Sequence, residues 1–453
     1  SATSQLLSRA KCSLLLPESI PTQVRESIKE TLEVEAICFE SKYLGLPTPE
    51  GRMKNDKFQP IIERFGKRCN GWNERFMSQA AKEVNVKAVA QALPTFIMGV
   101  FRLNQSFCDK YEKLIRDFWW GDKEDKRKVH WMSWEHMTRP KRAGGIGFRD
   151  MHLFNLALLA KQGWRLLQNS DSLCARVIKS RYYPHGNLID TVFAADTSPV
   201  WRGIEAGLEL LKKGIIWRVG DGSHINIWED PWIPSSPTRK VFTPRGNIVI
   251  TRVSELIDAE NRTWDEQLLN DIFWPIDVQR IMNIPLAVGM MDDFVSWHFN
   301  RSGIFSVRSA YHEEWEHQHG RKLRMTNSVQ SSSTSPIWST IWKLSVPAKI
   351  KIRVWRALLG AIPCLGVLAN RHMITSSQCP LCTSDCESIR HAMFLCPRVQ
   401  EIWRILGLQD VVQEMCALER DSGSVLADLL LPTNNTMAHM TDVQRNNLVT
   451  TTV

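Results

Sequence analysis

The stretch "QCPLCTSDCESIRHAMFLCP", residues 378–397, carries four cysteines and one histidine. Cys379 and Cys382 form a C-x-x-C pair, and His391 and Cys396 follow after eight and four intervening residues. A tetrahedral zinc ion takes four nitrogen or sulfur ligands, usually from two short-spaced pairs. The spacing therefore predicts a structural zinc site made of three thiols and one imidazole.

Two other interpretations of these cysteines stay open. A redox-active C-x-x-C pair begins a helix in a βαβ setting, and no such alternation surrounds residues 379–382. Unrelated core cysteines are the remaining alternative, and Cys386 is expected to be free. Four protein ligands leave no position for water or substrate, so zinc here would organise a segment too small to build its own core.

The charge of the chain favours a polyanionic partner without proving one. The sequence has 57 Lys and Arg against 48 Asp and Glu, for a net charge of +9. A merely basic surface explains the same excess. The 11 cysteines show no disulfide-framework spacing, which indicates a reducing, intracellular setting, nuclear or cytoplasmic. No apolar run reaches the roughly 18 residues of a membrane span, so no membrane partner is expected.

Apolar periodicity predicts a helix-rich α+β chain. The clearest helix lies in residues 106–121, with Ser106 as its cap and Gly121 as its stop. Its apolar stripe comprises Phe107, Tyr111, Leu114, Ile115 and Phe118. The stretch "IWRVGDGSHINIW", residues 216–228, alternates on both sides of a Gly-Asp-Gly-Ser centre and predicts a β-hairpin. Residues 303–311 are typical of a strand that enters a helix.

Basic side chains are interleaved with tryptophans or share one helix face. Most of the tryptophans are expected in the core, but such rings can also stack on unpaired bases. A helix that begins at Pro347 places three cations on one face, where a solvated surface and a phosphate-facing surface are the two alternatives. The candidate nucleic-acid contacts of both kinds are Lys126, Arg127, Lys128, Lys141, Arg142, Lys349, Arg353 and Arg356.

No catalytic motif emerges. Asp292 and Asp293 in "GMMDDF" are adjacent, as in a two-metal polymerase centre, but no partner carboxylate is evident. They are expected to be solvent-facing residues before an amphipathic strand. Phosphate-binding loops and the G-x-S-x-G and H-E-x-x-H motifs are also missing from the sequence. The chain is therefore expected not to be an enzyme.

Ordered blocks along the chain resemble a known family. The blocks are "KYLGLPTPEGR" (42–52), "KAVAQALPTF" (87–96), "FWWG" (118–121), "HWMSW" (130–134), "PKRAGGIGFRDMHLFNLALLAKQGWRLL" (140–167), "WRVGDGSHINIWEDPWIP" (217–234), "GIFSVRSAY" (303–311) and "IWKLSVPAKIKIRVWR" (341–356), followed by the cysteine pattern. Together they resemble the C-terminal part of reverse transcriptases from plant LINE-type (non-LTR) retrotransposons.

The resemblance implies an organisation for the whole chain. Residues 1–150 would hold the edge of the primer grip, including Lys42 as a nucleic-acid contact, and thumb-like helices. Residues 151–323 would be a Trp-rich connector. The Ser/Thr-rich residues 324–336 would be a linker and residues 337–410 the reverse-transcriptase zinc-binding domain. Residues 411–453 are expected to be a mobile tail.

The resemblance also implies a function. The family's catalytic aspartates lie upstream of the "KYLG" block, where this sequence does not reach, and a ribonuclease H-like domain would follow it. An upstream polymerase domain in cis would make the full-length relative an RNA-directed DNA polymerase. The leading hypothesis is non-catalytic binding of RNA or DNA template by a zinc-containing fragment. The alternative is a degenerate or co-opted fragment that acts as a protein-interaction scaffold.

Overall fold

The computed structural model is predominantly helical within the part of the chain that it describes. The described residues are 14, 16, 19–34, 42–48, 53, 55–71, 77–121, 128–258, 260–286, 291–326, 336–383, 386–417, 425–427, 430–431 and 450. Among them, three two-stranded antiparallel sheets accompany the helices, which confirms the expected helix-rich α+β class. None of the described helices has the length and apolar character needed to cross a membrane.

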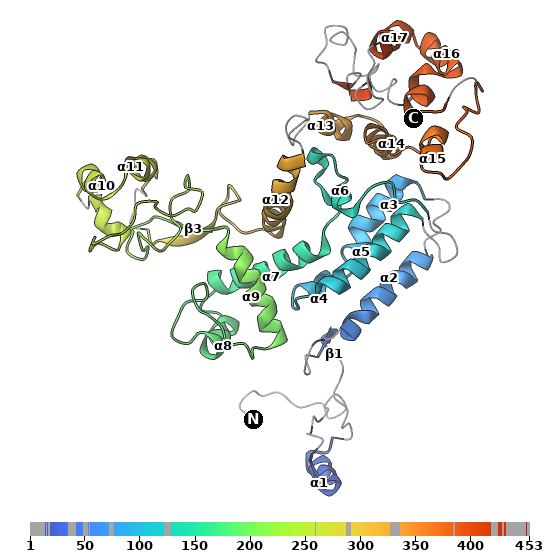
Figure 1. The fold of residues 1–453 in the computed structure, drawn as a ribbon. Coiled ribbons are helices and arrows are strands. Elements are labelled where there is room, and N and C mark those ends of the chain that lie inside the picture. Colours follow the sequence, from blue (N-terminus) through green and yellow to red (C-terminus); the bar gives the residue numbers. More distant parts are fainter. Residues whose placement is uncertain are drawn as a thin grey trace.

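Of the first described elements, helix α1 (Thr22–Leu32) lies apart from the main core (Figure 1), whereas Leu46 of the following hairpin packs against this core. Helix α1 buries none of its residues. Strands β1 (Lys42–Tyr43) and β2 (Leu46–Pro47) form a tight hairpin. Its turn residues Leu44 and Gly45 both have positive φ, as a two-residue turn of this kind requires.

The largest cluster of buried apolar side chains, here called the helical core, draws mainly on residues 58–215. Residues 297–315 add to it, and so do Ile352 and Trp355 from much later in the chain. The helices around it are α2 (Gln59–Gly71), α3 (Gln79–Asn85), α4 (Thr95–Met98), α5 (Gln105–Trp120), α6 (Trp134–Thr138), α7 (Met151–Gln168), α8 (Leu173–Tyr182), α9 (Pro199–Lys212) and α12 (Val307–Thr326).

Helix α5 is the one that the sequence predicts most clearly, and only its cap differs. The side chain of Asn104 accepts the Phe107 amide at 2.9 Å, so Asn104 is the cap and Ser106 lies inside the first turn. Gly121 ends the helix in the left-handed conformation. The apolar stripe faces the core, where Tyr111 and Ile115 are fully buried.

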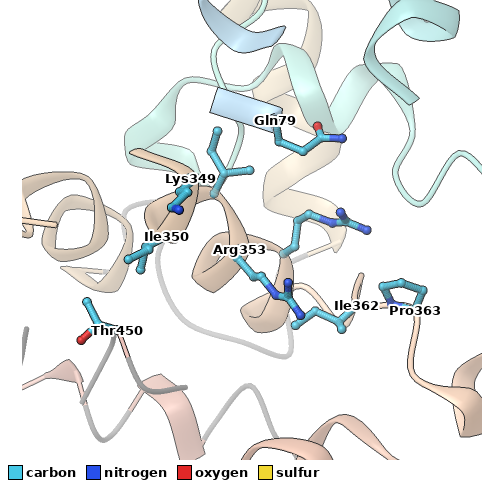
Figure 2. Close-up of a pocket in the computed structure, with 9 residues that line it drawn as sticks. Gln79, Lys349, Ile350, Arg353, Ile362, Pro363 and Thr450 are labelled. Atoms are coloured by element: carbon cyan, nitrogen blue, oxygen red, sulfur yellow. The ribbon is translucent and has the colours of Figure 1, made fainter. Parts of the chain in front are cut away.

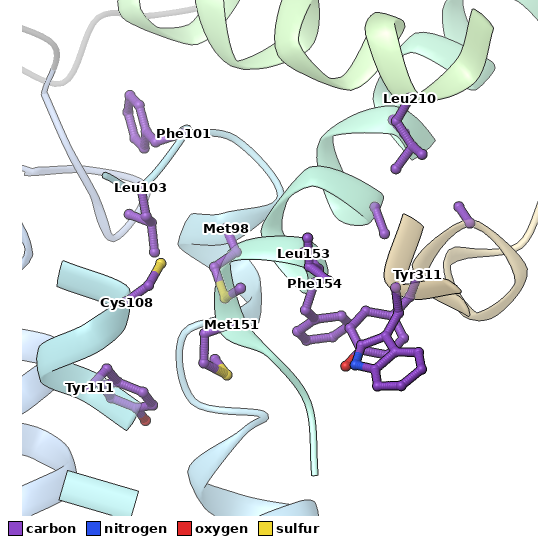
Figure 3. Close-up of a cluster of buried hydrophobic side chains, with 14 of the residues drawn as sticks. Met98, Phe101, Leu103, Cys108, Tyr111, Met151, Leu153, Phe154, Leu210 and Tyr311 are labelled. Atoms are coloured by element: carbon purple, nitrogen blue, oxygen red, sulfur yellow. The ribbon is translucent and has the colours of Figure 1, made fainter. Parts of the chain in front are cut away.

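Helices α7 and α9 pack closely enough to exclude a side chain at the crossing. A Cβ atom on Gly207 would lie 2.4 Å from the backbone nitrogen of Ala160. The buried Asn155 of α7 fixes the segment after α4, since it accepts the Leu103 amide at 2.8 Å and donates to the Met98 carbonyl at 2.7 Å. Figure 3 shows Met98 and Leu103 beside side chains from α5, α7 and α12.

A second cluster, the middle core, is formed by residues 219–286. Its elements are short: β4 (Ile257–Asp258), β5 (Thr263–Trp264), α10 (Glu266–Ile272) and α11 (Pro275–Met282). Ile225 and Ile227 are fully buried there, and they pair with residues 251–253 through the Ile227 amide and the Val253 amide. The region therefore folds around its own apolar centre with little regular structure.

The predicted hairpin in residues 216–228 is wrong. Strand β3 (Ile215–Arg218) pairs instead with β6 (Phe294–Trp297), which lies far along the chain. The reason is Asp293, whose carboxylate accepts the amides of Gly220, Gly222 and His224 at 2.7–2.9 Å. The loop wraps around this carboxylate and cannot fold back on β3.

Two other expectations near β6 are corrected. Asp293 is half-buried and anchors a loop, so it is not a solvent-facing residue. Of residues 303–311, expected to be a strand that enters a helix, the part before Val307 is irregular and the rest begins α12, while the extended segment is β6 itself. Gly303 takes a positive φ and its carbonyl accepts the Trp297 amide, so the chain turns back before α12 begins.

The third cluster, the C-terminal core, extends from Ile337 to Leu430. Its helices are α13 (Pro336–Lys343), α14 (Ala348–Leu358), α15 (Leu365–Asn370), α16 (Pro397–Ile405) and α17 (Gln409–Ala417). Val412 and Leu426 are buried in it, so these two residues of the segment 411–453 pack against the module, while most of that segment lies outside the described residues.

Helix α14 belongs to two cores at once. Ile352 and Trp355 enter the helical core, whereas Val354 and Ala357 enter the C-terminal core. The Trp355 indole donates to the Gly144 carbonyl at 2.7 Å. Of the expected linker 324–336, the first three residues continue α12 and Pro336 begins α13, while 327–335 lie outside the described residues. The C-terminal module is therefore docked on the helical core through α14.

Candidate metal centre

The structure brings Cys379, Cys382, His391 and Cys396 into one cluster. Their ligand atoms all lie within 4.8 Å of one another. The sulfur atoms of Cys379 and Cys396 are 4.0 Å apart, and the Cys382 sulfur lies 3.3 Å from His391 Nε2. Around a tetrahedral zinc ion, two sulfur ligands are about 3.8 Å apart, and a sulfur and a nitrogen about 3.6 Å apart. The donor set and its spacing fit such an ion.

Local backbone structure presents each of these side chains. The Thr383 amide donates to the Cys379 carbonyl at 2.9 Å and closes the turn that holds the C-x-x-C pair. His391 begins a short π-helix (His391–Leu395), and Cys396 is the N-cap residue of α16 with Pro397 in the first helical position. The Cys396 amide returns to the His391 carbonyl at 2.9 Å, which ties the second pair of donors together.

The cluster is closed to solvent on most sides. Cys379, His391 and Cys396 are buried and Cys382 is half-buried. Burial raises the pKa of the Cys396 thiol, while backbone hydrogen bonds from Arg398 and Val399 at the start of α16 act in the opposite direction. A bound cation would stabilise the thiolate form of all three cysteines. Such a site suits a structural ion, since four protein donors complete the coordination.

Cys386 is outside the cluster. It pairs with Gln378 in an isolated antiparallel bridge, and its side chain is exposed. The neighbouring Glu387 connects this loop to α15, because its carboxylate accepts the Leu365 amide at 2.6 Å and its carbonyl accepts the Gly366 amide at 3.0 Å. The loop that carries the first two donors is thus fixed to the C-terminal core on both sides.

Of the predicted nucleic-acid contacts in the first half of the chain, Lys128 lines a cavity together with Arg356 of α14, and the others do not converge. Lys42 is exposed on β1, and Lys126 and Arg127 lie outside the described residues. Lys141 lies 2.9 Å from the Glu83 carboxylate and 3.9 Å from the centre of the Trp342 ring, so it joins the helical core to α13. Arg142 is exposed, with Glu316 at 3.8 Å.

The predicted contacts on α14 do converge. Lys349, Arg353 and Arg356 line one cavity of about 520 Å³, and Gln79 of α3 lies across from them (Figure 2). Burial lowers the pKa of the Arg356 guanidinium, and the positive charge of Arg353 lowers it further. Arg356 is held in place by two donations to the Ala361 carbonyl, at 2.8 and 3.1 Å.

A second group of acidic and imidazole donors, Asp221, His224 and Asp293, is explained by the fold. Both carboxylate oxygens of Asp293 already accept backbone amides. The Asp221 carboxylate accepts the amide and hydroxyl of Ser223, and these bonds lower its pKa. These contacts hold the loop after β3 together without an ion.

Comparison with known proteins agrees with this geometry. Residues 305–403 match a family described as zinc-binding in reverse transcriptase, and all four clustered donors fall within the match. An uncharacterized mitochondrial protein of Arabidopsis thaliana is 41% identical over 143 residues, which cover 93% of that protein and 31% of this chain. The chain belongs to a family of reverse-transcriptase-related proteins.

A second relative is similar to a larger share of this reverse-transcriptase-related chain. A putative ribonuclease H protein of Arabidopsis thaliana is 30% identical over 371 residues, or 79% of the chain. The chain spans 57% of that relative's length. The family match begins at residue 305, whereas the sequence predicts the zinc-binding domain from residue 337, and the earlier start takes in α12.

Residues that the sequence does not single out also surround the α14 cations. Trp131 and Arg371 lie on the same side, with the Arg371 guanidinium 4.7 Å from the centre of the Trp131 ring. Both are far from α14 in sequence. The "HWMSW" block and the pattern of Trp beside basic residues point to Trp131, while nothing in the sequence points to Arg371.

Proposed function

We propose that the chain is a non-catalytic, nucleic-acid-binding part of a LINE-type retrotransposon reverse transcriptase. The observation that carries this proposal is the Cys3His cluster in a module docked on the helical core. The docking leaves a face of α14 with three cations open to solvent or cavity. The function that fits such a surface best is the holding of an RNA or DNA template, with the cations of the protein bound to the phosphates of the template.

In this proposal, Cys379, Cys382, His391 and Cys396 hold a zinc ion, which supplies cross-linking of the module and no chemistry. Packing and hydrogen bonds of the chain's own side chains supply the remaining stability of the module. Trp403 packs in the C-terminal core and donates from its indole to the Met393 carbonyl at 3.1 Å. The segment that carries the four donors and helix α16 thereby share one small core. Helix α14 connects this core to the helical core.

The non-catalytic part of the proposal rests on the carboxylates. Asp292 and Asp293 are the adjacent pair that could be compared with a polymerase centre, and Asp293 is used as a loop anchor. A two-metal centre needs free carboxylate oxygens that converge on the ions. Polymerase activity would then come from a domain in cis in a longer product, as expected for a relative that is an RNA-directed DNA polymerase.

The experiment that tests the proposal is a fluorescence anisotropy titration with structured RNA at several salt concentrations. We expect tight binding. The logarithm of the association constant should fall linearly with the logarithm of salt concentration, because phosphate contacts release counterions. Treatment with a strong chelator, or the substitution Cys379→Ser, should remove most of the binding. Cys386→Ser is the matched control, since it changes a cysteine of the same loop that is outside the cluster.

A protein-interaction scaffold is the second candidate, and a specific observation favours it. Ile402, Ile405 and Leu406 are exposed along α16, on a module that is otherwise well packed. Weak binding of RNA that does not depend on salt or on the chelator would reject nucleic-acid binding and leave this candidate. Primer extension by the purified chain would reject the non-catalytic assignment instead.

A further inference from the structure

Two cavities meet along the side of α14 that carries Arg356. The first has a volume of about 520 Å³ and lies between α3 and α14. The second, of about 470 Å³, extends toward residues 128–131 and α15. Both are lined by Gln79, Arg356 and Pro363, so they form one continuous groove, here called the α14 groove.

The described side chains that line the α14 groove are basic or uncharged. The first cavity contains Lys349, Arg353 and Arg356, and the second adds Lys128. No acidic residue occurs among the described lining residues of either cavity. Arg371 adds a further exposed cation above the Trp131 ring at the outer end. Burial, and then the charge of the neighbouring Arg353, lower the pKa of Arg356.

The walls between these cations are apolar and aromatic. Trp120, Trp131 and Met373 line the second cavity. Arg356 lies between the two cavities, fixed by the Ala361 carbonyl and 5.7 Å from the centre of the Trp120 ring. Cations that alternate with apolar and ring surfaces are typical of grooves for unpaired nucleic acid, in which phosphates meet the cations and bases meet the apolar walls.

The size of the groove limits the form of the nucleic acid. Each cavity has a volume in the range of roughly 300–1,000 Å³ that small-molecule sites occupy, which is enough for a nucleotide. A duplex, by contrast, presents its phosphates on a wide convex surface and keeps its bases stacked inside. A recessed site between two helices therefore fits one strand better than two.

We propose that the α14 groove binds a single strand of nucleic acid, with its phosphates against Lys349, Arg353 and Arg356. This inference rests on the proposed function and deepens it, because it assigns a site and a strandedness. Lys349 and Arg353 are exposed, and no ion pair of either is seen within the described residues. The groove places them where a strand can reach both.

The test compares two charge-matched double variants of the full chain. Lys349→Gln with Arg353→Gln removes two charges from the groove. Arg176→Gln with Lys179→Gln removes two charges from the exposed face of α8, on the far side of the helical core. Binding of labelled oligo(U) and oligo(dT) is measured by anisotropy over a series of salt concentrations, and a duplex of random sequence is measured in parallel.

We expect the groove variant to bind either single strand on the order of tenfold more weakly than the wild-type chain. Its slope of log K against log salt should fall by about 1.4, because each lost contact to a single strand contributes about 0.7. The α8 variant should stay within about twofold of wild type. Equal zinc content and equal melting temperature in the two variants show that the difference is not one of folding.

The outcomes separate the groove from the general proposal. If the wild-type chain binds no nucleic acid, both the proposed function and the α14 groove fail. If it binds but the two variants lose the same affinity, the groove is overturned and the proposed function stands. An equal loss on the duplex overturns the single-strand assignment. A loss of similar size on oligo(U) and oligo(dT) that is absent on the duplex supports the groove.

Discussion

The helical core and the C-terminal core reach a folded state by different means. The helical core buries a large set of aromatic side chains, among them the fully buried Trp119, Trp201 and Trp315. The C-terminal core is much smaller, and the segment that carries the Cys3His cluster contributes Ile389, Met393 and Phe394 to it. Burial of apolar surface can stabilise the first on its own, whereas the segment of the second that carries the ligands, residues 379–396, is too short to build a core without a cross-link.

The largest expected effect comes from removing the proposed zinc ion. Zinc binding in small modules is worth on the order of 10 kcal/mol, and this free energy is largely free energy of folding. Chelation should therefore unfold the C-terminal core and leave the helical core folded. Hydrogen exchange should rise by orders of magnitude in α16 and remain unchanged in α5.

Two cysteine variants provide the control for this experiment. Cys379→Ser should reproduce the effect of the chelator, since it removes a buried donor of the cluster. Cys386→Ser should keep both zinc and the protection of α16, since Cys386 is exposed and pairs only through its backbone with Gln378. Unchanged exchange in α16 after metal analysis has confirmed complete removal would show that the C-terminal core is stable by packing alone.

The next effect concerns the side chain that joins the two cores. Trp355 is fully buried in the helical core, while its neighbours Val354 and Ala357 belong to the C-terminal core. Trp355→Ala should lower the free energy of unfolding by about 3–5 kcal/mol, as for other large aromatic residues. It should also split denaturant unfolding into two transitions, measured by tryptophan fluorescence and far-UV circular dichroism.

Trp355→Phe separates the packing from the hydrogen bond. It keeps most of the buried volume but leaves the Gly144 carbonyl with one donor fewer, because the indole contact at 2.7 Å is lost. His136 still reaches that carbonyl at 3.1 Å, so the cost should be about 1 kcal/mol. A single cooperative transition in the alanine variant would contradict the idea that α14 couples two separately stable units.

The comparison of the two cores also shows which features of the structure could be predicted from the sequence. The C-x2-C-x8-H-x4-C spacing predicts the ligand cluster because its donors are close in the chain and the turns between them are short. Helix α5 is predictable for a similar reason, since periodicity and caps are local. The pairing of β3 with β6 is not, because it depends on a carboxylate, Asp293, more than 60 residues away from the loop that it organises.

Tertiary placement also decides the role of the basic residues. Lys141 and Arg353 look alike in the sequence, each among other cations and near a tryptophan. In the structure, Lys141 contacts Glu83 and Trp342, whereas Arg353 lines an open cavity without an acidic partner among the described lining residues. The different roles of Lys141 and Arg353 follow from the approach of α3 to α14, and no local sequence pattern encodes this approach.

A third effect, on pH dependence, belongs to the helical core alone. Burial, and then the charge of Asp150, raise the pKa of Glu112 to about 8 from its ordinary value of 4.5. The folded state thus favours the protonated carboxyl. Its contribution to stability is fully present below pH 4.5, declines as pH rises, and is lost above about pH 8.

Glu112→Gln should remove this dependence. Glutamine stays neutral and its oxygen can still accept the Met151 amide, which Glu112 accepts at 2.7 Å. We expect the variant to exceed wild type by on the order of 2–4 kcal/mol above pH 8 and to match it near pH 4. The lowered pKa of the half-buried His136, about 4, acts equally in both proteins and cancels in the difference. A difference in stability that did not change with pH would contradict the raised pKa.

The smallest expected effect lies at the surface contact between α13 and the helical core. Lys141 makes an ion pair with Glu83 and a cation–π contact with Trp342, and its side chain is 38% exposed. Lys141→Met keeps the length but removes the charge, and Lys87 remains 2.6 Å from Glu83. The cost should therefore be about 1 kcal/mol, measured by denaturant unfolding.

Arg142→Met is the matched control for this last change. Arg142 is exposed and lies 3.8 Å from Glu316, so its loss should alter the free energy of unfolding by less than about 0.5 kcal/mol. If Lys141 joins the two cores, its variant loses stability and keeps affinity for nucleic acid. The double variant Lys349→Gln with Arg353→Gln should instead keep its stability and lose affinity. A Lys141 variant with lower affinity and unchanged stability would instead place Lys141 among the phosphate contacts, because the Glu83 and Trp342 contacts would then contribute nothing to the docking of α13.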